Sequence, residues 1–215
     1  MMILTTEREE RVISLLEEHR YLERSMIQQK LFRFQTGIKK SQQVLTKMAE
    51  REQINRFRHG GRDEYIYHLG ERSQKWRHWL DINRFHYSLL RDLRGWQKIT
   101  YWDFEHRYPY GIADAFYIIK TTIHGDGIKF FLEMDDGQNK FDKVAKYMAY
   151  ADSRKWQGEF WGRDGNFPLI LIISLRLEEI ADTIKRCKAE KFFRLMKKEK
   201  VYRDIIKQVS KNWEG

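Results

Sequence analysis

The chain has 215 residues, a formal net charge of +10 and a sequence pI of about 9.6, which favour a polyanionic partner such as nucleic acid. Its single cysteine, Cys187, excludes an intrachain disulfide and a zinc site built from several cysteines, and it suits a reducing cytoplasm. The longest strongly apolar run, residues 167–175, is too short to span a bilayer, so we expect no membrane segment.

The first 75 residues have the pattern of three helices followed by a hairpin. Thr6 and Glu9 have the spacing of a capping box, which predicts the start of the first helix. Apolar periodicity and a Gly-Gly turn then predict two more helices and two strands, over residues 21–32, 38–51, 53–58 and 64–69. This order predicts a winged helix-turn-helix.

Residues 30–62 contain nine basic and two acidic side chains, a local net charge of +7. A helix that exposes lysine and glutamine can enter a major groove, and arginines of a hairpin can bind phosphates. We therefore predict that residues 1–75 bind double-stranded DNA, although a solvated basic face, or one that meets an acidic protein, would have the same composition. The candidate contact residues are Lys39, Lys40, Gln42, Gln43, Lys47, Arg56, Arg58 and Arg62.

The remaining sequence alternates between helical and strand-like patterns. The predicted order is helix, three strands, helix, strand and helix, over residues 76–94, 98–104, 112–120, 128–134, 139–154, 167–175 and 178–198, with a basic helix continuing to about 213. The predicted fold class is therefore α+β, in which an α/β restriction-endonuclease-like mixed-sheet domain follows the winged helix. The predicted domains are 1–75, 76–176 and 177–215, the last as basic helices packed on the core.

Three carboxylates fall near the ends of two predicted strands that form a hairpin. Asp114 lies near the start of the first strand, and strand alternation puts Glu133 and Asp135 on one face of the second. Carboxylates that converge can bind Mg²⁺, which can orient a water molecule and stabilise charge on a scissile phosphate. Asp114, Glu133 and Asp135 are therefore candidate metal ligands and, in an active nuclease, candidate catalytic residues.

Asp135 occupies the position at which such nucleases usually carry a lysine, two residues after the glutamate. Lys140 and Lys143 on the following helix are near enough to replace that lysine, so both are candidate catalytic residues. The structural alternative is that Asp114 and Glu133 pair with basic neighbours, while residues 135–137 form the turn that ends the strand.

The chain resembles the replication-relaxation family of plasmids and other mobile elements in Gram-positive bacteria, over roughly residues 5 to 176. Besides the N-terminal winged helix, the segments that carry the resemblance are Arg77-His78-Trp79-Leu80-Asp81-Ile82-Asn83, Ala113-Asp114-Ala115-Phe116 and Phe131-Leu132-Glu133-Met134-Asp135-Asp136-Gly137, the last before a lysine-rich helix. The family pattern also has an acidic residue where an active nuclease has lysine. The resemblance thus implies a nuclease-like fold with reduced odds of ordinary cleavage.

Two positions depart from the family pattern. Ala113 stands where a proline often precedes the aspartate, and Asp136 stands where a basic residue is common.

The leading interpretation is a cytoplasmic, dimeric DNA-binding protein that acts in replication, DNA relaxation or transcription control of a mobile element. Replication or relaxation proteins are expected as further partners. A Mg²⁺-dependent endonuclease or nickase and a protein-interaction adaptor are the alternatives.

Overall fold

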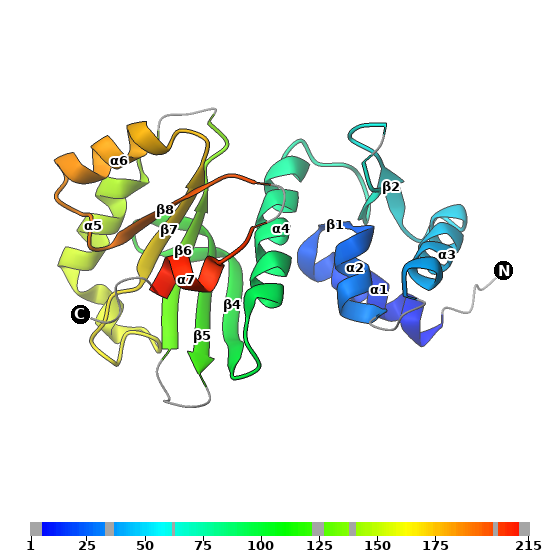
Figure 1. Cartoon of the computed structure of the whole chain (residues 1–215), viewed down its shortest axis with the longest axis horizontal. Helices are drawn as coiled ribbons and strands as arrows, with labels where there is room; N and C mark the ends of the chain where they lie inside the picture. The colour runs from blue at the N-terminus through cyan, green and yellow to red at the C-terminus, as the bar shows by residue number, and fades with distance from the viewer. Residues whose placement is uncertain are drawn as a thin grey trace. The chain divides into compact units, whose positions relative to one another are not determined.

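The computed structural model describes residues 6–32, 37–61, 63–121, 127–137, 141–199 and 202–210 (Figure 1). The chain forms two compact units, Met1–Tyr87 (unit 1) and Ser88–Gly215 (unit 2). The predicted mixture of helices and strands is confirmed, with a three-stranded antiparallel sheet in unit 1 and a five-stranded mixed sheet in unit 2. The division into residues 1–75, 76–176 and 177–215 is a finer one and stays a prediction.

Unit 1 combines helices with short strands. Its elements are α1 (Glu7–His19), β1 (Tyr21–Glu23), α2 (Arg24–Leu31), α3 (Gly37–Glu50), β2 (Asn55–Phe57), β3 (Ile66–His68) and the part of α4 (Trp76–Asp92) that ends at Tyr87. The sheet order is β1-β3-β2, with antiparallel neighbours. The hairpin strands are shorter than predicted from the sequence.

Local sequence explains where two helices of unit 1 begin. The predicted capping box is confirmed, because the Glu9 backbone N–H donates to the Thr6 hydroxyl at 3.3 Å and the Thr6 N–H donates to the Glu9 carboxylate at 2.8 Å. Gly37 starts α3, and a Cβ atom there would overlap the carbonyl oxygen of Phe32, so a larger residue would force the backbone to shift.

One prediction for unit 1 is wrong. The helix expected over residues 21–32 begins only at Arg24, because the three preceding residues form strand β1. β1 pairs with β3 in the register Leu22↔Tyr67, and Leu22 is fully buried. Pairing with a distant strand therefore outweighs the local helical pattern.

Unit 2 is built around its mixed sheet. Its strands are β4 (Gln97–Tyr108), β5 (Gly111–Thr121), β6 (Gly127–Met134), β7 (Leu169–Ser174) and β8 (Phe193–Lys197), in the order β4-β5-β6-β7-β8. β4, β5 and β6 are antiparallel neighbours, whereas β7 is parallel to β6 and β8 is parallel to β7. The remaining elements are α5 (Lys143–Ser153), a 3₁₀ turn η1 (Lys155–Gly158), α6 (Leu177–Arg186) and α7 (Ile205–Ser210).

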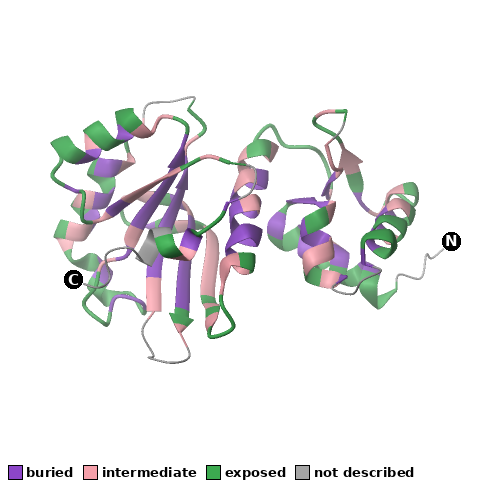
Figure 2. Ribbon diagram, in the orientation of Figure 1, coloured by how far each residue is buried: buried purple, intermediate pink, exposed green. Residues whose placement is uncertain are grey.

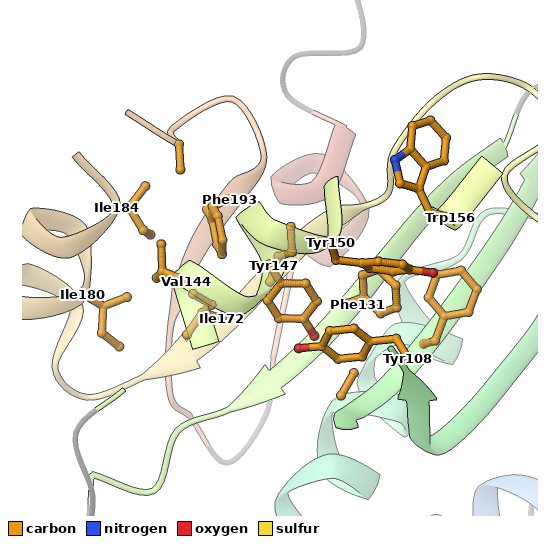
Figure 3. Close-up of a cluster of buried hydrophobic side chains, with 14 of the residues drawn as sticks. Tyr108, Phe131, Val144, Tyr147, Tyr150, Trp156, Ile172, Ile180, Ile184 and Phe193 are labelled. Atoms are coloured by element: carbon orange, nitrogen blue, oxygen red, sulfur yellow. The ribbon is translucent and has the colours of Figure 1, made fainter. Parts of the chain in front are cut away.

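A core rich in aromatic residues packs on one face of this sheet. Figure 2 shows that β5, β6 and β7 are mostly buried, as expected for central strands. Figure 3 shows the hydroxyl groups of Tyr108 and Tyr147 turned toward each other beside Phe131, and the two tyrosine rings stack with centroids 5.0 Å apart. Residues of α5 and α6 complete this cluster, so the two helices cover this face.

Residues near α7 are bound to the end of α4. The Tyr202 N–H donates to the Ser88 hydroxyl at 3.3 Å, and the Ile206 N–H donates to the Asp92 carboxylate at 2.8 Å. The Tyr202 hydroxyl lies 3.9 Å from the Met134 sulfur. Since side chains alternate along β6, Met134 is on the face opposite to Phe131 and Glu133.

The helix predicted over residues 178–198 is wrong in its second half. α6 ends at Arg186, and residues 193–197 form β8 instead, which pairs with β7 in the register Ile172↔Leu195. The expected all-helical segment after residue 176 therefore contributes a strand to the sheet. Residues 122–126 of the predicted turn, 138–140 at the predicted start of the following helix and 211–215 after α7 lie outside the described residues.

Candidate functional site

The basic face of α3 lies opposite its buried face. Ser41, Leu45 and Met48 point into unit 1 at helical spacing, and Gly37 is buried on the same face. All five candidate contact residues on this helix are exposed, namely Lys39, Lys40, Gln42, Gln43 and Lys47. The helix therefore exposes lysine and glutamine side chains to solvent, while other residues of the helix pack against unit 1.

Two arginines of the hairpin stack on one tyrosine. The guanidinium carbons of Arg56 and Arg58 lie 4.6 Å and 4.1 Å from the ring centroid of Tyr65. Arg56 also donates to the Thr46 hydroxyl of α3 at 3.3 Å, so this side of the hairpin faces α3. A pocket of about 240 Å³ separates the two elements. Arg62, the eighth candidate, lies outside the described residues.

An acidic residue at this pocket is neutralised by an arginine of α2. Arg24 forms an ion pair with Glu64 at 2.8 Å, and the Ser25 N–H donates to the same carboxylate at 2.9 Å. Sequence reasoning did not identify Arg24 or Tyr65, because their partners are distant in the chain.

In unit 2, Asp114 and Glu133 lie side by side. The register of β5 and β6 pairs Ala115 with Leu132, so Asp114 and Glu133 are the next positions beyond this pair. Lys143, the first residue of α5, donates to the Glu133 carboxylate and lies 3.8 Å from an oxygen of Asp114. The sequence-based expectation that Lys143 approaches these carboxylates agrees with this geometry. Lys140 lies outside the described residues.

Further hydrogen bonds hold each carboxylate in place. The Tyr147 hydroxyl donates to the second oxygen of Glu133 at 2.5 Å, and the Met134 N–H donates to Asp114 at 2.6 Å. Lys143 also donates to the carbonyl oxygen of Ile112 at 3.2 Å. Sequence reasoning missed Tyr147, although its position one helical turn after Lys143 places both on one face of α5.

The electrostatics of this carboxylate–lysine cluster (Asp114, Glu133, Lys143 and Tyr147) follow from burial. Glu133 is 1 % exposed. Burial, followed by the charge of Asp114, raises the pKa of Glu133 to about 8 against the opposing effects of Lys143 and Tyr147. Burial alone would lower the pKa of Lys143, but Glu133 and Asp114 outweigh it and raise this pKa. Glu133 and Lys143 therefore both hold their protons more tightly than in water.

Asp135 lies in a different environment from the other two carboxylates. It accepts hydrogen bonds from the Ser174 hydroxyl at 2.6 Å and from Arg176 at 2.9 Å and 3.2 Å. Burial alone would raise the pKa of Asp135, but these partners, with the Gly137 N–H, lower it. Ser174 is the last residue of β7 and Arg176 directly precedes α6, so no local sequence signal connects them with Asp135.

The described side chains do not fit the predicted three-carboxylate metal site. Asp135 is bound to Ser174 and Arg176, and the Lys143 ammonium group already occupies the space beside Asp114 and Glu133. Across the described ranges, no group of three or more His, Cys, Asp or Glu side chains is arranged to hold a metal ion. Two carboxylates with a lysine can instead relay a proton or bind a hydrogen-bond donor.

No protein-family model matches the sequence, and a search of curated proteins finds no significant match. Among the helices of the described residues, none has the length and apolar character required to cross a bilayer.

Proposed function

We propose that this chain is a cytoplasmic DNA-binding protein, an accessory or regulatory factor of a plasmid or another mobile element that acts as a homodimer. Residues of unit 1 form a winged helix-turn-helix that holds duplex DNA, with α3 as recognition helix and the β2–β3 hairpin as wing. Unit 2 contains a nuclease-like domain that contacts DNA or the second subunit without robust cleavage.

The observation that carries the proposal is the continuity of the basic face of α3 with the arginines of the hairpin. Arg56 bonds to Thr46 of α3, and its neighbour Arg58 is held on the same Tyr65 ring. Stacked guanidinium groups are pre-organised, so less side-chain entropy is lost when they bind phosphates. Exposed lysine and glutamine side chains on a helix match phosphate oxygens and base edges in a major groove.

The element order of unit 2 supports a nuclease-like fold. Three antiparallel strands, a helix and a strand parallel to the third, from β4 to β7, follow the order inferred from the sequence. Part of the replication-relaxation resemblance rests on segments of these elements. Asp135, which stands just after β6 where a nuclease usually has lysine, is bound to Arg176, and burial raises the pKa of Glu133 to about 8. Both features argue against robust cleavage.

A specific observation also favours a second candidate, a divalent-cation-dependent deoxyribonuclease. Lys143 supplies an ammonium group beside Asp114 and Glu133, where a nuclease needs a lysine. This candidate predicts nicking that requires an added cation and that is lost in Glu133→Gln, a substitution that preserves shape.

One titration with supercoiled plasmid DNA, with and without Mg²⁺, tests both candidates on the same gel. We expect retardation without nicking. Cation-dependent nicking that disappears in Glu133→Gln would overturn the non-cleaving assignment. No retardation near physiological salt would overturn DNA binding and would support the adaptor alternative.

The recognition-helix assignment is tested by the double substitution Lys39→Ala, Lys40→Ala. We expect about tenfold weaker binding to all duplex sequences, and a decrease of roughly 1 to 2 in the slope of log affinity against log salt, since each lost phosphate contact removes about 0.9. Lys185→Ala with Arg186→Ala removes the same charge from exposed positions on α6 and is the matched control. An equal effect of both double variants would show that only overall charge matters.

A further inference from the structure

A pocket in unit 2 lies away from the carboxylate–lysine cluster. Its volume is about 570 Å³, within the range of small-molecule sites. It lies where β7 begins at Leu169 and just before β8 begins at Phe193. Glu133 pairs with Ile172, three residues further along β7, or about 10 Å at strand spacing.

Helix α5 reaches both places through its opposite ends. Lys143 is its first residue and contacts Glu133, whereas Asp152 lies near its last turn and lines the pocket. Nine positions along a helix correspond to about 13 Å. The pocket is therefore a separate site with its own chemistry.

Three aromatic side chains form one wall of the pocket. Phe167 packs edge-on against Trp156 and against Phe192, with ring centroids 5.6 Å apart in both pairs. The Trp156 indole N–H donates to the Ala151 carbonyl at 3.0 Å, which fixes this ring at the edge of the core cluster in Figure 3. This rigid apolar wall suits a planar ring.

The rim of the pocket is basic on one side. The Lys191 ammonium lies 4.7 Å from the ring centroid of Phe192. Arg194 donates to the carbonyl oxygens of Phe193 at 2.7 Å and Glu190 at 3.2 Å, which hold its guanidinium group at the pocket. Two cations beside an aromatic wall match a ligand that joins a planar ring to an anionic group.

Besides these cations, the pocket is lined by side chains that accept hydrogen bonds. Asp152 supplies a carboxylate acceptor and Asn166 an amide, both exposed, from α5 and from the loop before β7. Amino groups of bases and sugar hydroxyls are donors that such acceptors bind.

We propose that this pocket binds a nucleotide through its 5′-phosphate, with the base against Phe167 and Phe192 and the phosphate at Lys191 and Arg194. The same chemistry comes from a free nucleotide or from the 5′-phosphorylated end of a DNA strand. The proposal goes beyond duplex binding by unit 1, because no residue of α3 or of the hairpin takes part.

Calorimetric titration of the full chain with three probes tests the proposal. We expect saturable binding of dAMP, and at least about tenfold weaker binding of deoxyadenosine and of inorganic phosphate, since each probe lacks one half of the contacts. Absence of dAMP binding would overturn the proposal. Phosphate that binds as tightly as dAMP would also overturn it, because the pocket would then be a plain anion site.

Substitutions at exposed lysines locate the binding without risk to the core. Lys191→Glu should weaken dAMP binding by at least about tenfold, because it places a carboxylate beside the phosphate. Lys185→Glu makes the same charge change on α6 at a residue that does not line the pocket, and it should leave dAMP binding unchanged. Equal effects of the two substitutions would overturn the assignment.

A fourth probe, 5′-phosphorylated trideoxyadenylate, distinguishes a free nucleotide from the end of a DNA strand as the ligand. It is titrated into the Lys39→Ala, Lys40→Ala variant, in which unit 1 contributes little to DNA binding. Tighter binding than dAMP identifies a strand end as the ligand. Equal or weaker binding identifies the free nucleotide. Because dAMP does not rely on duplex contacts, failure of the duplex-binding proposal leaves these results interpretable.

Discussion

Glu133 and Asp135 lie two positions apart in the sequence, yet their chemistry differs because their partners differ. Burial and Asp114 raise the pKa of Glu133 to about 8, whereas Arg176 and Ser174 overcome burial at Asp135 and lower its pKa. A buried carboxyl group beside a like charge holds its proton, and one beside a guanidinium group releases it. Residue identity alone therefore does not predict which of the two is charged at neutral pH.

The raised pKa of Glu133 predicts that the folding stability of unit 2 decreases as pH rises. An unfolded glutamate loses its proton near 4.5 and the folded one near 8, so the contribution of Glu133 is fully present below 4.5 and declines as pH rises toward 8. Glu133→Gln, which carries no titrating proton, should therefore become more stable relative to the original chain across this window. The gain is at most about 5 kcal/mol, since one pKa unit corresponds to about 1.4 kcal/mol.

Urea unfolding of both proteins at several pH values between 4.5 and 8 measures this difference. Glu178→Gln, at an exposed position on α6, serves as control and should show almost no pH-dependent difference. If the stability difference for Glu133→Gln stays constant across the window, the raised pKa is wrong.

At the scale of elements, Asn83 of α4 joins three segments of unit 1. Its amide donates to the carbonyl oxygens of His19 at 2.7 Å and Tyr21 at 2.8 Å, and its oxygen lies 3.0 Å from Nδ1 of His19. Since the amide oxygen is an acceptor, Nδ1 of His19 carries the hydrogen. One fully buried side chain thus fixes the end of α1, the start of β1 and the middle of α4.

Asn83→Ala should destabilise unit 1 by about 2 to 4 kcal/mol, because it leaves two buried carbonyl groups without this donor. Denaturant unfolding followed by a probe in unit 1 measures the loss. Asn55→Ala removes a single hydrogen bond at an exposed position, to the Gly70 carbonyl, and should cost less than about 1 kcal/mol. Equal losses in the two variants would contradict a special role for Asn83.

Whether an element can be predicted from sequence depends on how far apart in the chain its interacting residues lie. The Thr6–Glu9 capping box is a contact over three residues, so its spacing alone identifies it. Four of the five residues of β8 are arginine, leucine, methionine and lysine, which favour helices, and pairing with β7 makes the segment a strand. The same limit applies to Asp135, whose partners Ser174 and Arg176 are about forty positions away.

At the scale of the whole molecule, the two units should respond to pH in opposite directions. In unit 1, burial lowers the pKa of His19 to about 4 and that of His86 well below its ordinary value. Their unfolded forms take up protons near 6.5, so the stability of unit 1 should fall as pH decreases from 6.5 toward 4. The Glu133 contribution makes unit 2 lose stability as pH rises instead.

Hydrogen exchange measured by mass spectrometry, corrected for intrinsic rates, separates the two responses. We expect easier opening of α1 and β1 at pH 5 than at pH 7, with an opening free energy lower by up to about 2 kcal/mol for His19. His19→Gln should reduce this dependence, and the sheet of unit 2 should not share it. The same acid response in both units would contradict a local origin.

The hydrogen bonds from Tyr202 and Ile206 to α4 have a consequence for the order of events during synthesis. Each bond joins residues 114 positions apart. At about 5 to 20 residues per second, a ribosome needs roughly 6 to 23 seconds to add this length. The half of α4 that holds Asn83 can make its contacts early in synthesis. The other half gains the backbone N–H groups of Tyr202 and Ile206 as partners only 114 residues later. A nascent chain therefore exposes part of one helix for seconds, an interval in which a chaperone can bind it.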